Sequence, residues 1–217
     1  MVDFTGMAPF FRDRTEAGCK LAEKVKPLVQ GSNVVVAVLP RGGVPVGFEV
    51  AQALKAQMDV LVVRKLGVPG QKELAFGAIA GGQQFIDHSL VASLQLTPEE
   101  VARVVEQEAR ELRGKEELYR AHRSPVSFDT RTVILVDDGM ATGSTMSVAV
   151  QTARQAGAAW IIVAVPVASA TALQQCRMEA DECVCLATPA QFRAVSEWYE
   201  DFSPVSDAEA RLLLASV

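Results

Sequence analysis

The chain has 217 residues, of which 49% are apolar and 22% charged, and its formal net charge is −5. This length fits one domain with a large core, and the composition is that of an ordinary globular protein. The negative charge argues against a nucleic-acid partner, which would require a basic face. No run of about 18 uncharged apolar residues occurs, and no leader-like segment opens the chain, so we expect a cytoplasmic protein that binds no membrane.

The cysteines also exclude some classes of protein. Cys19, Cys176, Cys183 and Cys185 are too few and too irregularly spaced for a disulfide framework or a zinc site. Cys183 and Cys185 alternate in the segment ECVCLA, which is typical of one buried face of a strand. We therefore predict core cysteines instead of metal ligands.

Strands and helices alternate along the chain, which predicts an α/β fold with a mainly parallel sheet flanked by helices. No repeat or low-complexity linker divides the sequence, so we expect a single domain over residues 1–217. In chain order, the expected elements are a helix at 13–29, a strand at 33–39, a helix at 44–56, a strand at 59–64, a helix from 97 to about 121, a strand at 132–137, a helix at 144–156, a strand at 160–166, a further helix, and a strand at 182–187.

A cation and two glycines follow the first predicted strand. Arg41, Gly42 and Gly43 open onto the next helix, so a positive side chain and bare backbone meet at a helix N-terminus. That arrangement predicts an anion site. It is not a dinucleotide fingerprint, because the glycine spacing differs and the next strand ends in Arg64 and Lys65 instead of an acidic residue. The competing interpretation is a strand-to-helix turn with a surface arginine.

Residues 65–88 are rich in glycine and polar residues, which predicts a long loop or hairpin excursion instead of a crossover helix. Few large apolar side chains interrupt the glycines, so we expect few buried contacts to fix this segment. The next helix has a clear start, since Thr97 is a cap, Pro98 follows it and Glu100 closes a capping box. The glycines of the excursion are Gly67, Gly70, Gly77, Gly81 and Gly82.

The most informative segment is VILVDDGMATGST, residues 133–145. Its apolar run is typical of a strand buried on both faces of a parallel sheet, so a ligand is expected at its carboxyl end. Asp137 and Asp138 fall there, where carboxylates can accept hydrogen bonds from the hydroxyls of a sugar. The following turn suits a phosphate, because it carries hydroxyl groups and precedes a helix. An acidic pair after a strand can also be an ordinary cap. The turn consists of Gly139, Met140, Ala141, Thr142, Gly143, Ser144 and Thr145.

This segment resembles the phosphoribosyl pyrophosphate (PRPP) motif of the type I phosphoribosyltransferases: an apolar strand, two acidic residues, a few variable positions, then T-G-x-[ST]. In that family the acidic pair contacts the ribose hydroxyls and the turn wraps the 5′-phosphate. The stretch around Arg41 resembles the pyrophosphate loop of xanthine–guanine-type members, in which the peptide before the Arg position can be cis. Pro40 precedes Arg41 here, and the sequence leaves open which bond, if either, is cis. With FRDRTEAG near its start and EWYEDF near its end, the chain looks most like predicted phosphoribosyltransferases of unassigned acceptor.

The resemblance implies a type I phosphoribosyltransferase fold with a lid at about 65–88 and a small C-terminal hood at about 188–205. It also implies transfer of a phosphoribosyl group from PRPP to a nitrogen acceptor, release of pyrophosphate, Mg²⁺ as cofactor and a homodimer. Asp137 and Asp138 would contact the metal only indirectly. The implied catalytic residues are Asp137, Asp138, Arg41 and Arg64, and the implied PRPP-binding residues are Arg41, Gly42, Gly43, Lys65, Asp137, Asp138 and the turn from Gly139 to Thr145.

The sequence does not determine the acceptor, although a small nucleobase is favoured. Glu73 in the lid and an aromatic ring in the hood, Phe192 or Trp198, are the expected acceptor contacts. An aromatic cluster of this kind is more often part of a core. Ala141 stands where hypoxanthine–guanine members have an Asp, which disfavours that acceptor class, whereas adenine- and uracil-type members also carry Ala.

Two other functions compete with catalysis. A non-catalytic PRPP sensor would share the fold, but a sensor that binds DNA should add a basic surface or a winged-helix segment, and neither is visible in the sequence. A flavodoxin-like receiver would place acidic residues after the first strand, where this chain has Leu39, Pro40 and Arg41.

Overall fold

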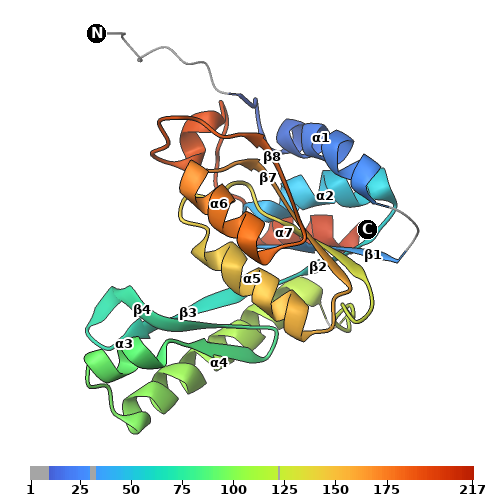
Figure 1. Ribbon diagram of the computed structural model, residues 1–217. Helices are drawn as coiled ribbons and strands as arrows, with labels where there is room; N and C mark the ends of the chain where they lie inside the picture. Colours follow the sequence, from blue (N-terminus) through green and yellow to red (C-terminus); the bar gives the residue numbers. More distant parts are fainter. Residues whose placement is uncertain (1–9, 30–32, 122) are drawn as a thin grey trace, which may run out of the picture.

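The computed structural model describes residues 10–29, 33–121 and 123–217, without the side chains of Lys72 and Glu73. Its centre is a parallel five-stranded sheet with helices on both faces (Figure 1), which confirms the predicted α/β class. The strands lie in the order β2 (Gln57–Val60), β1 (Val34–Val38), β6 (Thr132–Val136), β7 (Trp160–Val167) and β8 (Glu182–Ala187). The helices around them are α1 (Arg14–Val25), α2 (Gly43–Leu54), α5 (Ser144–Gln155), α6 (Ala170–Glu179) and α7 (Asp207–Ala215), with short 3₁₀ turns η1 (Lys26–Leu28) and η2 (Val195–Trp198).

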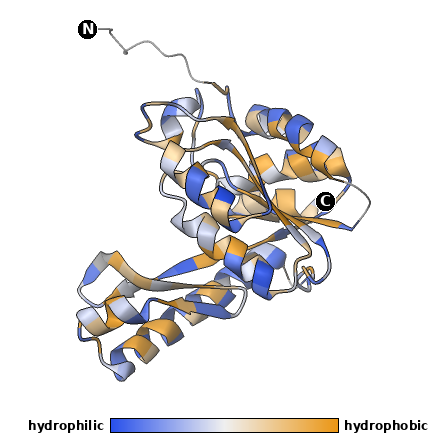
Figure 2. Cartoon of the chain, viewed as in Figure 1, coloured by the Kyte–Doolittle hydropathy of each residue, from blue (hydrophilic) through white to orange (hydrophobic). Residues whose placement is uncertain are grey.

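The central strands are buried on both faces, as their unbroken apolar runs predict. In β1, Val34, Val36 and Val38 belong to one core, which also contains residues of α1, α2 and α7. Val35 and Ala37 point the other way, into a core shared with α5 and α6. Figure 2 shows the resulting hydrophobic colouring along the strands of the sheet. Successive side chains of one short strand therefore hold helices on opposite faces.

Residues 63–120 form a second, smaller body that we call the hairpin lobe. Three antiparallel strands, in the order β3, β4 and β5, pack on a long helix (Figure 1). The hairpin interpretation of residues 65–88 is therefore correct, but the expected lack of buried contacts is wrong. Leu66 and Phe76 are completely buried, because they are the inward-facing residues of paired strands. The elements of the lobe are β3 (Val63–Val68), β4 (Gln71–Ala80), β5 (Gln83–Ile86), α3 (His88–Ser93) and α4 (Pro98–Arg120).

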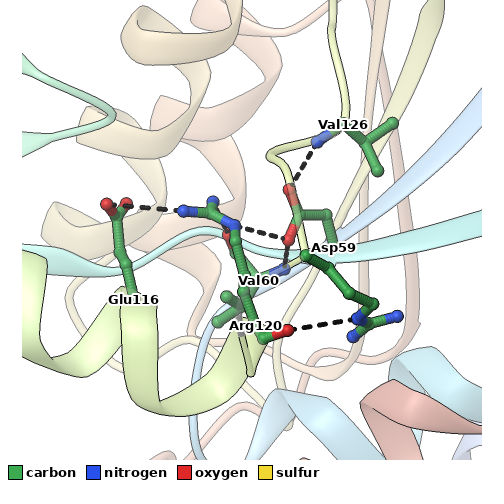
Figure 3. Close-up of polar contacts among 6 residues, drawn as sticks. Asp59, Val60, Glu116, Arg120 and Val126 are labelled. Carbon is green, nitrogen blue, oxygen red and sulfur yellow. Dashed lines mark hydrogen bonds and ion pairs between the residues drawn. The ribbon is translucent and has the colours of Figure 1, made fainter.

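A buried polar network joins the end of α4 to β2, the edge strand of the central sheet (Figure 3). Arg120 Nε donates to Asp59 Oδ1 at 2.9 Å, and an Nη2 N–H of Arg120 donates to the Val60 carbonyl at 2.9 Å. The other carboxylate oxygen of Asp59 accepts from the Val126 N–H at 2.9 Å. Glu116 forms an ion pair with Arg120 at 3.4 Å. Since Asp59 is only 5% exposed, these partners are needed to offset the loss of its water.

The register of the central sheet brings two loops together. Strands β1 and β6 are parallel neighbours with Val38 opposite Val136, so residues 39–43 and 137–143 follow these strands side by side at their carboxyl ends. The Leu39 N–H still donates to the Val136 carbonyl at 2.9 Å, which extends this pairing into the loops. Ligands of parallel α/β sheets bind at the carboxyl ends of the strands.

Most predicted elements are found within a few residues of their expected bounds. The capping box at Thr97 and Glu100 is present, with both of its hydrogen bonds. Three features are not predicted by the sequence: α3, α7, and the division of the expected strand 59–64 into β2 and β3. The division separates a strand of the parallel sheet from a strand of the hairpin lobe.

Candidate active site

The acidic pair lies directly after β6, at the carboxyl end of the sheet where the two loops meet. The Asp138 N–H donates to Asp137 Oδ1 at 2.8 Å. Burial, and then the neighbouring charge of Asp138, raise the pKa of Asp137 well above its ordinary value. Burial also raises the pKa of Asp138, but Arg14 opposes this effect by donating from Nε to Asp138 Oδ2 at 2.8 Å. The two carboxylates thus form one coupled, partly desolvated acceptor site.

The loop after β1 packs against this pair because it contains two glycines. A Cβ atom on Gly42 would lie 1.9 Å from Asp138 Oδ2, and one on Gly43 would lie 2.7 Å from the Val136 carbonyl. Only a residue without a side chain permits this approach. The cis peptide bond of the loop is Pro40–Arg41, which answers the question that the sequence left open. The Arg41 side chain is 48% exposed, so its guanidinium is accessible to an anion.

The turn after the acidic pair has the features of an anion site. Gly143 adopts φ +78° and precedes α5 without a side-chain cap on the helix. In the described part of the chain, no group accepts from the N–H groups of Ala141, Thr142 and Gly143. The Thr142 and Ser144 hydroxyls lie 3.1 Å apart at the exposed tip of the turn. Donors without protein partners, gathered at a helix N-terminus, suit a phosphate group.

Met140 differs from the rest of this turn. Its side chain is 3% exposed, and its N–H donates to the Val167 carbonyl at 2.9 Å. Its carbonyl accepts from the Ser169 N–H, also at 2.9 Å. Its backbone therefore attaches the turn to the end of β7, and neither its N–H nor its buried side chain is free to contact a ligand.

Arg64 and Lys65, the basic residues at the start of the predicted lid, have different surroundings. Arg64 and Lys65 are consecutive on β3, so their side chains point to opposite faces of the hairpin sheet. Lys65 lines a cavity of about 790 Å³ that also includes Ser144 and Thr145, and this brings it close to the phosphate turn. Arg64 instead pairs with Glu108 on α4, at 2.6 Å and 2.8 Å. The structure thus does not place Arg64 with the acidic pair. The side chain of Glu73 lies outside the described part of the structure.

The aromatic residues of the hood are mostly core. Trp198 is 6% exposed and stacks on Phe10 with ring centroids 5.2 Å apart. Phe192 is partly buried and packs against the same cluster. The burial of Trp198 favours the core alternative over stacking on an acceptor. Neither ring lines the cavity beside Lys65.

Sequence reasoning missed three residues that contact the predicted site. Arg14 begins α1 and pairs with Asp138. The Tyr199 hydroxyl donates to the Asp138 carbonyl at 2.6 Å, and burial raises its pKa so that it stays protonated. Asp207, in the first turn of α7, lies 3.8 Å from Arg41. Arg14 and Tyr199 belong to FRDRTEAG and EWYEDF, the terminal segments used to recognise the resemblance, but no local pattern connects them to the acidic pair.

Residues 15–201 match the family described as "Phosphoribosyl transferase domain". The chain belongs to this family. Two Mycobacterium tuberculosis proteins, "Putative phosphoribosyl transferase MT0597" (strain CDC 1551 / Oshkosh) and "Putative phosphoribosyl transferase Rv0571c" (strain ATCC 25618 / H37Rv), are each 45% identical to it over 200 residues. The match covers 92% of this chain but 45% of each relative, so the chain spans about half the length of the curated relatives it matches.

Two solved structures share the fold of this chain. The crystal structure of TT1426 from Thermus thermophilus has a TM-score of 0.82 and 39% identity, over 95% of this chain and 98% of that one. AQ2163 from Aquifex aeolicus has a TM-score of 0.52 and 11% identity, over 93% of this chain and 85% of the AQ2163 chain. At that identity the likeness shows the fold alone. The predicted type I phosphoribosyltransferase fold is thereby confirmed.

Two kinds of feature are absent from the described residues. No helix among them has both the length and the apolar stretch that a membrane span requires. Nor do those residues contain three or more His, Cys, Asp or Glu side chains close enough together to hold a metal ion.

Proposed function

We propose that this chain transfers the phosphoribosyl group of PRPP to a nitrogen atom of a small acceptor and releases pyrophosphate. The observation that carries the proposal is the contact of Gly42 with Asp138, which joins the predicted pyrophosphate loop to the predicted ribose-binding pair. Family membership supports phosphoribosyl transfer in general. The acceptor, and the activity of any longer protein that contains this chain, are part of the proposal.

Each part of the site has a role in this reaction. Asp137 and Asp138 accept hydrogen bonds from the ribose hydroxyls. The hydroxyls of Thr142 and Ser144 and the free N–H groups of the turn bind the 5′-phosphate. Arg41 binds the departing pyrophosphate, whose negative charge grows as the anomeric C–O bond breaks. Holding substrate and acceptor in place and stabilising that charge account for catalysis without a covalent intermediate.

The donor set fits a Mg²⁺ ion held mainly by substrate. Two carboxylates are too few for a complete protein cage, but Mg²⁺ keeps several waters and commonly binds through one or two carboxylates and substrate phosphates. Asp137 and Asp138 would hold such an ion through the ribose hydroxyls or water. When bound, it supplies positive charge that neutralises the pyrophosphate.

We further propose that the hairpin lobe is the lid of this site. Lys65 lines the same cavity as Ser144 and Thr145, so movement of the lobe toward α5 would bring a second cation to the phosphates. Phe192 and Glu73 remain proposed acceptor contacts, and a nucleobase remains the proposed acceptor. A homodimer and a cytoplasmic location also remain predictions.

The test is to incubate the protein with PRPP, Mg²⁺ and a panel of nucleobases and to measure pyrophosphate and nucleotide. We expect at least one base to release pyrophosphate, and chelation of Mg²⁺ to abolish the release. Arg41→Ala should lower kcat strongly and weaken PRPP binding less, because its contact is with the leaving group. Micromolar PRPP binding with no turnover for any base would instead support the sensor function.

A further inference from the structure

Arg14 connects the two ends of the chain at the acidic pair. It is the first residue of α1, and its Nε donates to Asp138 Oδ2 at 2.8 Å across 124 positions of sequence. The two side chains are 10% and 14% exposed, so water only weakly screens their attraction. An Nη1 N–H of Arg14 donates to the Ser203 carbonyl at 2.9 Å. The guanidinium therefore joins α1, the acidic pair and the hood.

Aromatic contacts restrict the Arg14 guanidinium further. Its central carbon lies 3.8 Å from the centroid of the Phe202 ring and 5.9 Å from that of Tyr199. Such cation–π contacts attract the guanidinium to the ring faces and reduce its rotational freedom. Tyr199 also binds the Asp138 main chain through its hydroxyl. The Asp138 carboxylate and its own backbone are thus fixed by separate partners, one from each end of the chain.

We propose that Arg14 is a positioning residue for ribose recognition. It fixes the direction of the Asp138 carboxylate, so that this group is ready to accept a hydrogen bond from a ribose hydroxyl of PRPP. Arg14 need not touch the substrate to do this. This inference rests on the proposed function, because it concerns the same acidic pair.

The alternative is that Arg14 only attaches the hood to α1. A purely structural bond would lower the melting temperature when removed, and it would leave PRPP affinity unchanged in the molecules that remain folded. A positioning residue should instead affect affinity more than stability. It should also lose its effect when Asp138 can no longer act as a charged acceptor.

The experiment compares Mg²⁺–PRPP binding by calorimetry, together with melting temperatures, in the 217-residue chain. We expect Arg14→Gln to weaken binding at least tenfold, and Arg14→Lys to recover part of that loss because it keeps the charge but not the planar fork. Arg12→Gln is the matched control, since Arg12 is 69% exposed and its side chain pairs with its neighbour Asp13. This control should bind PRPP as the wild type does.

A double-mutant cycle supplies the decisive comparison. Once Asp138→Asn is present, adding Arg14→Gln should weaken binding less than twofold further. If the fold-losses of PRPP affinity in the two single variants multiply in the double variant, the two residues act independently and the inference is overturned. The inference is also overturned if Arg14→Gln binds PRPP as the wild type does while Asp138→Asn binds it more weakly. If the wild type itself does not bind PRPP, the proposed function fails and the inference fails with it.

If Arg14→Gln does not fold, Phe202→Leu replaces it, because this variant keeps the cation and removes the ring. We expect a several-fold loss of PRPP affinity in Phe202→Leu. Unchanged affinity would contradict the proposal.

Discussion

Arg41 and Asp207 lie 3.8 Å apart, so the loop after β1 meets the first turn of the C-terminal helix α7. The same carboxylate accepts from the Tyr119 hydroxyl at 2.7 Å and from Lys115 Nζ at 3.0 Å, both on α4. One side chain thus contacts the predicted pyrophosphate loop and the long helix of the hairpin lobe. Binding of pyrophosphate by Arg41 would compete with this ion pair.

The ion pairs of Asp207 predict a pH-dependent contribution to stability. The hydrogen bonds from Tyr119 and Lys115 lower the pKa of Asp207 below its ordinary value. A carboxylate with a lowered folded-state pKa stabilises the fold above its unfolded pKa of about 3.9, and this contribution is lost as the pH falls through the folded-state pKa. Asp207→Asn should therefore be less stable than wild type at pH 7, and the difference should shrink below about pH 4.

Urea unfolding at several pH values would measure this difference. Glu111→Gln serves as the control, because Glu111 is exposed on α4. A gap between Asp207→Asn and wild type that stayed constant down to pH 3 would show that the ion pairs are not its cause.

The acidic pair gives a second prediction. Replacing Asp137 and Asp138 by Asn keeps their size but removes the charge that is proposed to accept from the ribose hydroxyls. Hydrogen bonds to charged groups contribute about 1.5–3 kcal/mol each, so PRPP binding should weaken at least tenfold. The variant should still fold, because the Asn side-chain oxygens can still accept from the N–H of residue 138 and from Arg14 Nε. Calorimetry that finds unchanged PRPP affinity would remove both residues from the site.

Gly42 gives a third prediction. Its φ of −61° and ψ of −36° suit any residue, so the backbone itself would accept alanine. The new Cβ would collide with Asp138 Oδ2, and either the loop or the carboxylate must move. Gly42→Ala should weaken PRPP binding at least tenfold, which is about 1.4 kcal/mol.

Gly114→Ala is the matched control for this variant. A Cβ at Gly114 meets nothing within 4 Å, and the residue lies inside α4. Alanine there should leave binding unchanged and stabilise the protein by up to about 1 kcal/mol through its helix propensity. Equal PRPP affinity in the two variants would mean that the close approach of loop and acid has no part in binding.

Phe76 tests whether the hairpin lobe is a packed structure or a loose excursion. Because Phe76 is fully buried, Phe76→Ala should cost about 3–5 kcal/mol of stability. Leu74→Ala on the same strand should cost much less, since Leu74 is 36% exposed. Hydrogen exchange should show slow amides in β3 and β4 of the free wild-type protein. Fast exchange throughout the lobe, together with a small effect of Phe76→Ala, would restore the interpretation as a loose segment.

The sequence predicted those features that depend on neighbouring residues. The apolar run Val133–Val136 predicted the central strand, and the residues after it predicted an acidic pair followed by a turn with free donors. The capping box of α4 was equally local. Glycine content misled the interpretation of residues 65–88, because the alternation that buries Leu66 and Phe76 is interrupted by β-bulges at Gly67.

Contacts between distant segments could not be predicted in this way. The pairing of Arg14 with Asp138 depends on how α1 packs on the sheet, and no spacing in one sequence reports it. The Arg41–Asp207 contact likewise requires α7, which the sequence did not predict. Arg64 and Lys65 are adjacent in the chain but separate in space, because a strand directs successive residues to opposite faces.

The segment that matches the family ends short of these partners on both sides. Residues 15–201 exclude Arg14 at one boundary, and Phe202, Ser203 and Asp207 at the other. A fragment trimmed to the matched boundaries would keep every motif residue of the PRPP loop and the pyrophosphate loop. It would nevertheless leave the Asp138 carboxylate without its cation and Arg41 without its carboxylate. Expression fragments should therefore include residues 10–217, and tags and fusion junctions should lie outside them, because residues that flank the matched segment contact the proposed binding site.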